Sequence, residues 1–292
     1  MSESPADRLR TLKLQGGYFP VGPRARFSIG GSDAKRYLNG QLTIDIGKIP
    51  QSSARGACLL TAKGKLCAVV FVWSNETGFL VDAPLPLRDE LGARLERYII
   101  ADDVSVTDES TPEAGYHVFG SLPSPAGRVI RRLGVPGFDV LQPPPDALEA
   151  TGDEVEILRI VNGSPQWGSE LDADTLVQEA RLEETAVDFD KGCYVGQEVV
   201  SRLKSVGRVN RRLHGFIGDL NDPGNLPIRL APVGRPDDSS GTLTSIRYDF
   251  ELARTVALGY LHRNFESVDR FVATDSSGRT LGEVEKREFP IS

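Results

Sequence analysis

The chain has 292 residues, 39% of them hydrophobic and 26% charged, which are the proportions of an ordinary globular protein with one large domain or two to three smaller ones. Its 34 Lys and Arg residues against 41 Asp and Glu residues give a formal net charge of -7, which argues against a surface built throughout for nucleic acid. No run approaches the roughly 20 apolar residues that span a bilayer, and the N-terminus lacks the apolar core of a signal peptide, so we expect no membrane contact.

The three cysteines, Cys58, Cys67 and Cys193, are an odd number without close spacing. This pattern argues against a disulfide framework and favours a reducing compartment, so we expect a cytoplasmic protein. The histidines are scattered, and no C-x-x-C or H-x-x-x-H spacing indicates a preformed metal site. We therefore expect no metal site built from this chain alone.

Helix and strand signals alternate through the first part of the chain. The predicted elements are, in chain order, a helix over 32–41, strands over 65–73 and 79–83 joined by a turn at 75–78, a helix over 86–100 and a strand over 102–108. The second helix has Leu87, Leu91 and Leu95 on one face and Pro86 in its first turn. This order predicts a small α+β sandwich over residues 52–120.

The second part of the chain begins with a stretch rich in Pro and Gly, residues 122–153, which predicts a connection. The apolar run VEILRIV (155–161) then predicts a strand, and the acidic residues after it predict irregular structure. Beyond residue 212, short β segments separated by turn signals such as DSSG predict a small barrel or sandwich.

The segment KGCYVGQEVVSRLKSVGRVNRR (191–212) contains the most informative cysteine. Val199, Val200, Leu203 and Val206 recur at helical spacing and predict a helix over 198–207, so Cys193 would lie in a glycine-flanked loop ahead of a helix N-terminus. Backbone N–H groups at that end and the charge of Lys191 would both favour the thiolate. The sequence therefore predicts a functional thiol.

Other readings of this segment stay open. Free cysteine is often a buried filler, and this reading suits Cys58 and Cys67 better than Cys193, whose neighbours would make a poor core. We expect Tyr194 to pack beneath the loop, and Gln197 and Glu198 to cap the helix or to hold the loop closed. The basic residues that follow form either a solvated helix face or a site for an anionic ligand or RNA backbone.

The segment KGCYVGQE (191–198) matches the signature of the folate-binding YgfZ family, whose fold is that of aminomethyltransferase, the T-protein of the glycine cleavage system. Three more segments resemble pieces of that family in the same order, namely SDAKRYLNGQLTIDI (32–46), LLTAKGKL (59–66) and LRIVNGSPQWGSEL (158–171). The resemblance covers most of the chain.

This resemblance implies an α+β fold, a three-domain ring of the aminomethyltransferase folate-binding type with a C-terminal β-barrel. The implied domains are a discontinuous folate-binding domain from 1–51 and 145–210, an inserted α+β domain of ferredoxin-like form from 52–144, and the barrel from 211–292.

The resemblance also implies a reduced folate, such as tetrahydrofolate, as cofactor. Arg159 would lie near it, because a guanidinium suits the glutamate tail or the pterin carbonyl; an ion pair with Glu156 or Glu170 is the alternative. The implied functional groups are Cys193 and Lys191, and the implied folate contacts are Arg159, Glu170, Tyr194, Gln197 and Glu198.

Three classes of function compete. The resemblance favours an accessory factor for iron–sulfur cluster assembly or repair, with an indirect effect on tRNA modification. In this function Cys193 would share a transient cluster with an assembly or client protein, because one cysteine cannot supply the usual four ligands. A folate-dependent aminomethyltransferase or demethylase is the alternative, but Ala68 and Val69 stand where aminomethyltransferases have an acidic pair. The acidic charge and the lack of a stacking motif argue against direct nucleic-acid binding.

Overall fold

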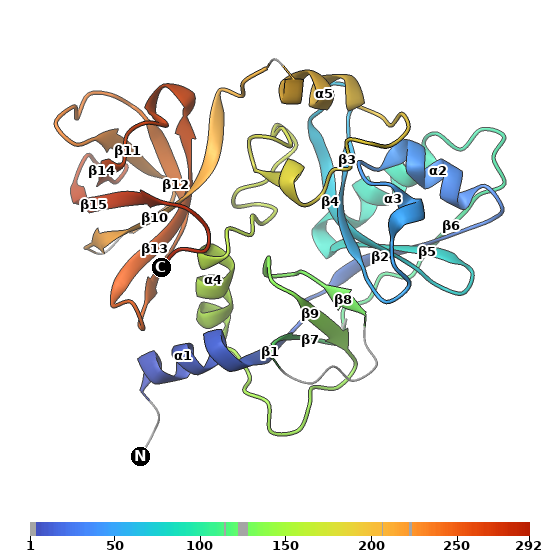
Figure 1. Ribbon diagram of the computed structural model, residues 1–292, viewed down its shortest axis with the longest axis horizontal. Coiled ribbons are helices and arrows are strands. Elements are labelled where there is room, and N and C mark those ends of the chain that lie inside the picture. The colour runs from blue at the N-terminus through green and yellow to red at the C-terminus, as the bar shows by residue number, and fades with distance from the viewer. Residues whose placement is uncertain (1–3, 114, 122–127, 206, 222–223) are drawn as a thin grey trace.

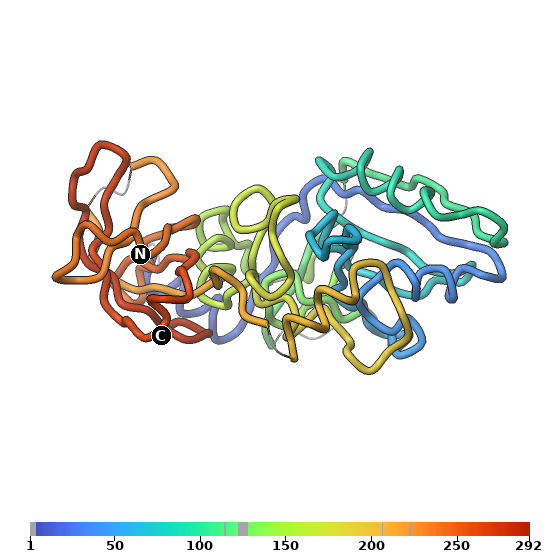
Figure 2. Tube along the Cα trace, turned by 90° about the horizontal axis from the view of Figure 1, so that it is seen from above, coloured from blue at the N-terminus to red at the C-terminus, as the bar shows by residue number. Residues whose placement is uncertain are grey.

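The computed structural model describes residues 4–113, 115–121, 128–205, 207–221 and 224–292. Figure 1 shows a lobe with a five-stranded sheet, a lobe with a four-stranded sheet, and a C-terminal barrel. The segment 163–196, which has little regular structure, runs between them. Seen from above, the molecule is elongated, with the barrel at one end (Figure 2). The expected α+β class and the C-terminal barrel are confirmed.

The five-stranded sheet is antiparallel and mixes strands from before and after residue 52. Its order is β3 (Arg55–Leu60), β4 (Leu66–Ser74), β5 (Gly78–Pro84), β2 (Arg24–Gly30) and β6 (Ser105–Asp108). Two helices, α2 (Ala34–Gln41) and α3 (Arg88–Glu96), pack on it, and their leucines share one buried cluster with the valines of β4. The predicted helix at 32–41, the hairpin and the strand at 102–108 are therefore confirmed, and the predicted helix at 86–100 is confirmed in its central part.

The four-stranded sheet has the order β1 (Gly16–Pro20), β7 (Tyr116–Gly120), β9 (Gly137–Val140) and β8 (Val129–Ile130), and it follows the first helix, α1 (Pro5–Gln15). The prediction of a plain connection over 122–153 is wrong for β8 and β9, while residues 122–127 of that stretch lie outside the described residues. These strands are short and separated by turns. The Pro and Gly residues of this stretch are typical of loops, so the local sequence gives no strand signal.

The run VEILRIV belongs to a helix, α4 (Gly152–Val161), and the predicted strand is wrong. Thr151 and Glu154 form a capping box at its start, in which each side chain accepts a hydrogen bond from the backbone N–H of the other. The helix is buried on two sides. Ile157 and Ile160 pack against the barrel, and Leu158 packs against the four-stranded sheet, so both sides are apolar. A helix buried in this way lacks the polar stripe that reveals helical periodicity.

A buried charge network joins the two sheets. Asp82 of β5 is fully buried and accepts hydrogen bonds from Arg24 at 2.6 Å, from Arg26 at 3.0 Å and from Arg132 at 3.1 Å. Arg132 also binds Asp139 of β9. The guanidinium groups hold the pKa of the Asp82 carboxyl below its usual value despite its burial. The network therefore fixes the five-stranded sheet against the four-stranded sheet.

The barrel is closed, with the strand order β10, β13, β12, β11, β14, β15. The strands are β10 (Arg211–Leu220), β11 (Ile228–Pro232), β12 (Gly241–Asp249), β13 (Arg254–His262), β14 (Arg270–Thr274) and β15 (Thr280–Arg287). Phe216 and Phe271 fill its interior with an edge-to-face contact at 6.0 Å between ring centroids. The other helices of the described residues are α5 (Gln197–Ser205) and the short η1 (Ile46–Lys48), η2 (Leu85–Leu87), η3 (Leu182–Glu184) and η4 (Arg263–Phe265).

The domain boundaries that we expect from the sequence stay a prediction, and they do not coincide with the sheets. Strand β2 precedes residue 52 but lies in the same sheet as β3, whereas β7 to β9 fall within 52–144 but lie in the same sheet as β1. Only the start of the barrel near residue 211 follows the expected division. None of the helices in the described part of the chain is long and apolar enough to cross a membrane.

Candidate functional site

Cys193 lies in the loop that leads into α5. Its side chain is exposed, whereas Cys58 is buried and Cys67 is partly buried, and all three are free thiols. Helix α5 begins four residues later, at Gln197, and the Sγ of Cys193 makes no hydrogen bond with any described residue. The sequence-based expectation of a loop ahead of a helix is confirmed, but the helix N-terminus does not contact the sulfur.

Lys191 fixes this loop to the end of α2. Its Nζ donates hydrogen bonds to the carbonyl oxygens of Asn39, Leu42 and Ile44, each at 2.7 Å. The last carbonyls of a helix lack intrahelical partners and attract a cation. All three N–H groups of the ammonium are therefore used within the protein, and none is left to donate to Cys193. Burial lowers the pKa of Lys191 to about 8.

Tyr194 and Gly196 anchor the other side of the loop. Tyr194 is buried among Cys58, Leu60 and other core residues, and the Lys191 ammonium lies 5.0 Å from its ring centroid. The expectation that Tyr194 packs beneath the loop is confirmed. Gly196 has a φ of +86°, and a Cβ at this position would lie 2.6 Å from the carbonyl oxygen of Thr61, so only glycine fits. The thiol is thus presented on a loop held at both ends.

Gln197 and Glu198 open α5 without capping it. Neither side chain makes a hydrogen bond with any residue that the structure describes, so the expected capping is wrong. The helix ends at Ser205 as the structure defines it, and Val206, which we expected on its apolar face, lies outside the described residues. Glu198 is exposed, and the proposed contacts of both residues with folate stay a prediction.

Arg159 and Glu170 lie together at the junction of α4 and the barrel. Arg159 uses all five N–H groups of its guanidinium: two bind Glu156, one binds Glu170 Oε2 at 2.8 Å, one binds the Ser164 carbonyl and one binds Ser245 Oγ. The ion-pair alternative that we weighed for Arg159 is therefore present in the structure.

The Glu170 carboxylate is equally engaged. Its Oε1 accepts hydrogen bonds from Thr244 at 2.8 Å and from Ser245 at 2.6 Å, and its Oε2 also accepts the backbone N–H of Gln166. Both Arg159 and Glu170 are buried. A ligand could reach either residue only by breaking this network, so the pair does not fit a folate contact in this arrangement.

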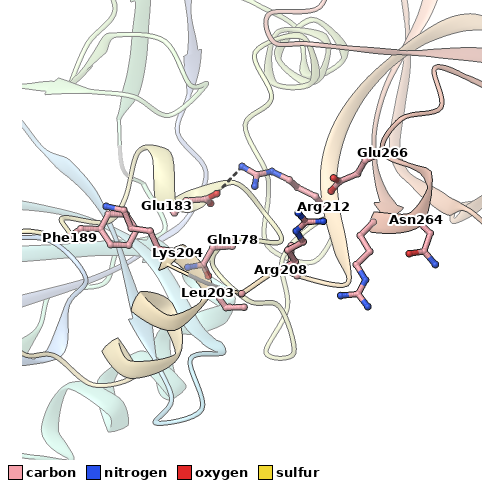
Figure 3. A pocket seen from close by; sticks show the side chains of 12 residues that line it. Gln178, Glu183, Phe189, Leu203, Lys204, Arg208, Arg212, Asn264 and Glu266 are labelled. Atoms are coloured by element: carbon pink, nitrogen blue, oxygen red, sulfur yellow. Dashed lines mark hydrogen bonds and ion pairs between the residues drawn. The ribbon is translucent and has the colours of Figure 1, made fainter.

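A separate pocket of about 810 Å³ lies between the segment 178–189, the end of α5 and the loop after β13. Figure 3 shows Gln178 and Glu183 on one wall, and Arg208 and Arg212 towards the barrel. Part of the basic run singled out in the sequence thus lines a cavity. By contrast, Arg211 pairs with Glu179 at 3.1 Å.

The architecture is similar to that of a solved aminomethyltransferase. The glycine cleavage system aminomethyltransferase T from Bartonella henselae superposes with a TM-score of 0.81 over 98% of this chain and 89% of its own, at 16% sequence identity. At this identity the match shows the fold alone, and it confirms the aminomethyltransferase-type arrangement with its C-terminal barrel.

Sequence relatives decide the family. A tRNA-modifying protein YgfZ from Pectobacterium atrosepticum is 29% identical over 223 residues, 65% of this chain and 67% of that protein. Another YgfZ, from Aliivibrio fischeri, is 26% identical over 90% of this chain and 88% of its own length. An uncharacterized protein of Haemophilus influenzae is 30% identical over 64% of this chain and 68% of its own. The chain belongs to the YgfZ family. No protein-family model matches it.

Ala68 and Val69 of this YgfZ chain stand where the resemblance implies an acidic pair in aminomethyltransferases. Ala68 lies in β4 with a fully buried side chain, and Val69 packs beside the cluster beneath the Cys193 loop. Neither side chain can accept a proton or stabilise a developing cation.

The residues of the pocket include some that our reading of the YgfZ sequence missed. Gln178, Glu183 and Arg263 stand in no motif, and they meet only because the barrel folds back towards the segment 178–189. Only the basic run after Leu203 indicated from the sequence that a ligand could bind here.

Proposed function

We propose that this protein is an accessory factor for iron–sulfur cluster assembly or repair, and that reduced folate binds to it as a modulator. The observation that carries the proposal is the exposed Cys193 thiol on a loop held by the Lys191 carbonyl contacts and by buried Tyr194. A thiol presented in this way suits transient contact with another protein, because the loop keeps its shape while the sulfur stays accessible.

A partner must complete any cluster that Cys193 holds. Among the described residues there is no group of three or more His, Cys, Asp or Glu side chains placed to share a metal ion. Clusters usually have four protein ligands. In the proposal Cys193 supplies one thiolate, the assembly or client protein supplies the others, and Lys191 and Tyr194 keep the loop in place during the exchange.

An effect on tRNA would then be indirect. Several relatives are named tRNA-modifying proteins, and the enzymes that thiolate tRNA use iron–sulfur clusters, so poorer cluster supply would lower the amount of modified tRNA. The alternative is a folate-dependent aminomethyltransferase or demethylase. Such an enzyme places a carboxylate by the folate, but Ala68 and Val69 occupy that position in this chain, so the alternative is disfavoured.

The test is complementation of a strain that lacks the gene, with the wild type, Cys193→Ser and Cys67→Ser as matched control. We expect the wild type and Cys67→Ser to restore both the activity of iron–sulfur enzymes and the content of thiolated tRNA, and Cys193→Ser to restore neither at equal protein level. Full restoration by Cys193→Ser would remove Cys193 from the function. A loss of tRNA modification with normal iron–sulfur enzymes would instead indicate direct action on tRNA.

A further inference from the structure

The pocket beside the barrel carries an excess of positive charge in a protein whose formal net charge is -7. Its lining includes four cationic side chains and two carboxylates, namely Lys204, Arg208, Arg212 and Arg263 against Glu183 and Glu266. Figure 3 shows Arg208 and Arg212 towards the barrel, across from Gln178 and Glu183. The pocket therefore attracts anionic groups, although the net charge of the protein repels them.

Two of these cations have no anionic partner in the described part of the chain. Arg208 and Arg263 are exposed, and neither guanidinium makes an ion pair or hydrogen bond with a described residue. Arg212, by comparison, is held by Glu183 and Glu184. Arg208 and Arg263 are therefore the groups available for carboxylates, which a guanidinium can bind through two parallel hydrogen bonds.

The wall across the pocket has two buried oxygen atoms without donors. Gln178 is 6% exposed, and its Nε2 binds the Val200 carbonyl at 2.9 Å, but its Oε1 has no partner among the described residues. The Oε2 of Glu183 is likewise buried and unpartnered, whereas its Oε1 accepts a hydrogen bond from Arg212 at 2.8 Å. Buried acceptors are costly to leave unpaired, and a ligand that brings N–H groups to this wall would relieve that cost.

These features together suit an acidic polypeptide better than a nucleic acid. The carboxylates of Glu183 and Glu266 repel a continuous line of phosphates, and a phosphodiester backbone has no N–H donor. A polypeptide has backbone N–H groups, spaced carboxylates, and apolar side chains that can contact Leu203 and Val209. The volume of about 810 Å³ lies within the roughly 300–1,000 Å³ that ligand sites occupy.

We infer that this pocket is a docking site for an acidic, partly apolar segment of a partner protein, with carboxylates on Arg208 and Arg263 and backbone N–H groups facing Gln178 and Glu183. This docking site gives the partner of the proposed function its chemistry, and so rests on that function. Helix α5 separates the Cys193 loop at its start from the pocket at its end, and its 9 residues span about 14 Å. A partner held in the pocket can therefore bring its own ligands near the thiol without covering it.

The experiment measures the affinity of four fluorescent probes by anisotropy. They are a hexapeptide of alternating glutamate and leucine, its counterpart with glutamine for glutamate, the acidic hexapeptide with an N-methylated backbone, and a hexamer of uridylate. The proteins are the wild type, Arg208→Ala/Arg263→Ala, Gln178→Met, and Arg97→Ala/Arg270→Ala as control, because Arg97 and Arg270 are exposed arginines outside the pocket. Circular dichroism and thermal unfolding check that each variant is folded.

We expect the wild type and the control variant to bind the acidic peptide at least about tenfold more tightly than the glutamine peptide, as two charge-assisted contacts should allow. Arg208→Ala/Arg263→Ala should bind these two peptides equally. Gln178→Met should weaken binding of the acidic peptide by about fivefold but leave that of the N-methylated peptide unchanged, because the methylated backbone has no N–H to donate.

Equal affinity of the wild type for the acidic and the glutamine peptides, or no binding of either, would overturn the inference. Tighter binding of the uridylate than of the acidic peptide, lost in Arg208→Ala/Arg263→Ala, would also overturn it and make the pocket a nucleic-acid site. None of these measurements involves a cluster, so such results leave the function of Cys193 standing. Complementation by Cys193→Ser tests that function separately.

Discussion

Arg159 Nη1 donates a hydrogen bond to Glu170 Oε2 at 2.8 Å, and both side chains are buried where α4 meets the barrel. Ser245 of β12 binds both partners, accepting from Arg159 Nη2 at 2.7 Å and donating to Glu170 Oε1 at 2.6 Å. Tyr260 of β13 adds a hydrogen bond to the Glu170 carbonyl at 2.8 Å. Two motif residues that the resemblance assigns to folate therefore join the barrel to the rest of the molecule.

Replacing Arg159 should destabilise the protein. We expect Arg159→Met to lower the free energy of unfolding by about 3–5 kcal/mol, because it leaves the Glu170 carboxylate buried without its cation. Urea unfolding measures the change, with Arg202→Ala as a surface control that should shift it by less than about 0.5 kcal/mol. Adding Glu170→Gln should recover part of the loss. An unchanged midpoint in Arg159→Met would mean that the ion pair does not hold the junction.

Cys193 should be the reactive thiol of the chain. It is exposed, whereas burial raises the pKa of the Cys58 thiol to about 12 and also raises that of Cys67. We expect iodoacetamide to modify Cys193 first in the native protein at neutral pH, as followed by mass spectrometry. Cys193→Ser should leave the urea midpoint unchanged. Equal labelling rates at Cys58 and Cys193 would contradict this picture.

Stability should fall in mild acid because of His214. This residue is 8% exposed, neither ring nitrogen has a partner among the described residues, and burial lowers its pKa from 6.5 to about 4. The unfolded chain therefore takes up a proton as the pH falls below about 6.5, while the folded chain does so only near pH 4.

The stabilisation from neutral His214 should be complete above pH 6.5 and lost by about pH 4. The pKa difference between the folded and unfolded chains corresponds to a loss of about 3 kcal/mol in the free energy of unfolding. Urea unfolding at several pH values measures it. In His214→Leu the free energy of unfolding should fall less steeply across this window, whereas His262→Leu should keep the wild-type slope. Equal slopes in His214→Leu and the wild type would exclude His214 as the cause.

The charge network between the sheets should be sensitive to Asp82. We expect Asp82→Asn to lower the free energy of unfolding by about 3–5 kcal/mol, because it leaves three guanidinium groups without their shared buried anion. Asp102→Asn, which breaks an exposed pair with Arg36, should cost at most about 1 kcal/mol. Similar losses in the two variants would show that the buried network contributes no more than a surface pair.

Elements with simple periodicity could be predicted from the sequence. The leucines of α3 and the alternating valines of β4 follow the spacing that burial on one face requires. Helix α4 was missed because it is buried on two sides, although the Thr151–Glu154 capping box was a local signal for it. Strands β8 and β9 depend on pairing with β7, which no local pattern shows.

The site was predictable only in part. The glycine-flanked loop with an exposed thiol could be predicted, because Gly196 and the helix that follows it are local features. The direction of the Lys191 side chain could not, because its acceptors lie about 150 residues earlier, at the end of α2. Nor does a sequence show which arginine is already paired, as Arg212 is and Arg208 is not.

The order of the strands along the chain also governs when each part can form during synthesis. Strands β1 and β2 are neighbours in sequence but enter different sheets, and β1 must wait for β7. Such distant pairing slows folding, but all strands of both sheets have been made by residue 140, before any barrel strand leaves the ribosome. The barrel then draws all of its strands from 211–287 and can close by itself. The cavity lined by Gln178 and Arg263 can therefore form only after the chain has been made through β13 and the segment that follows it.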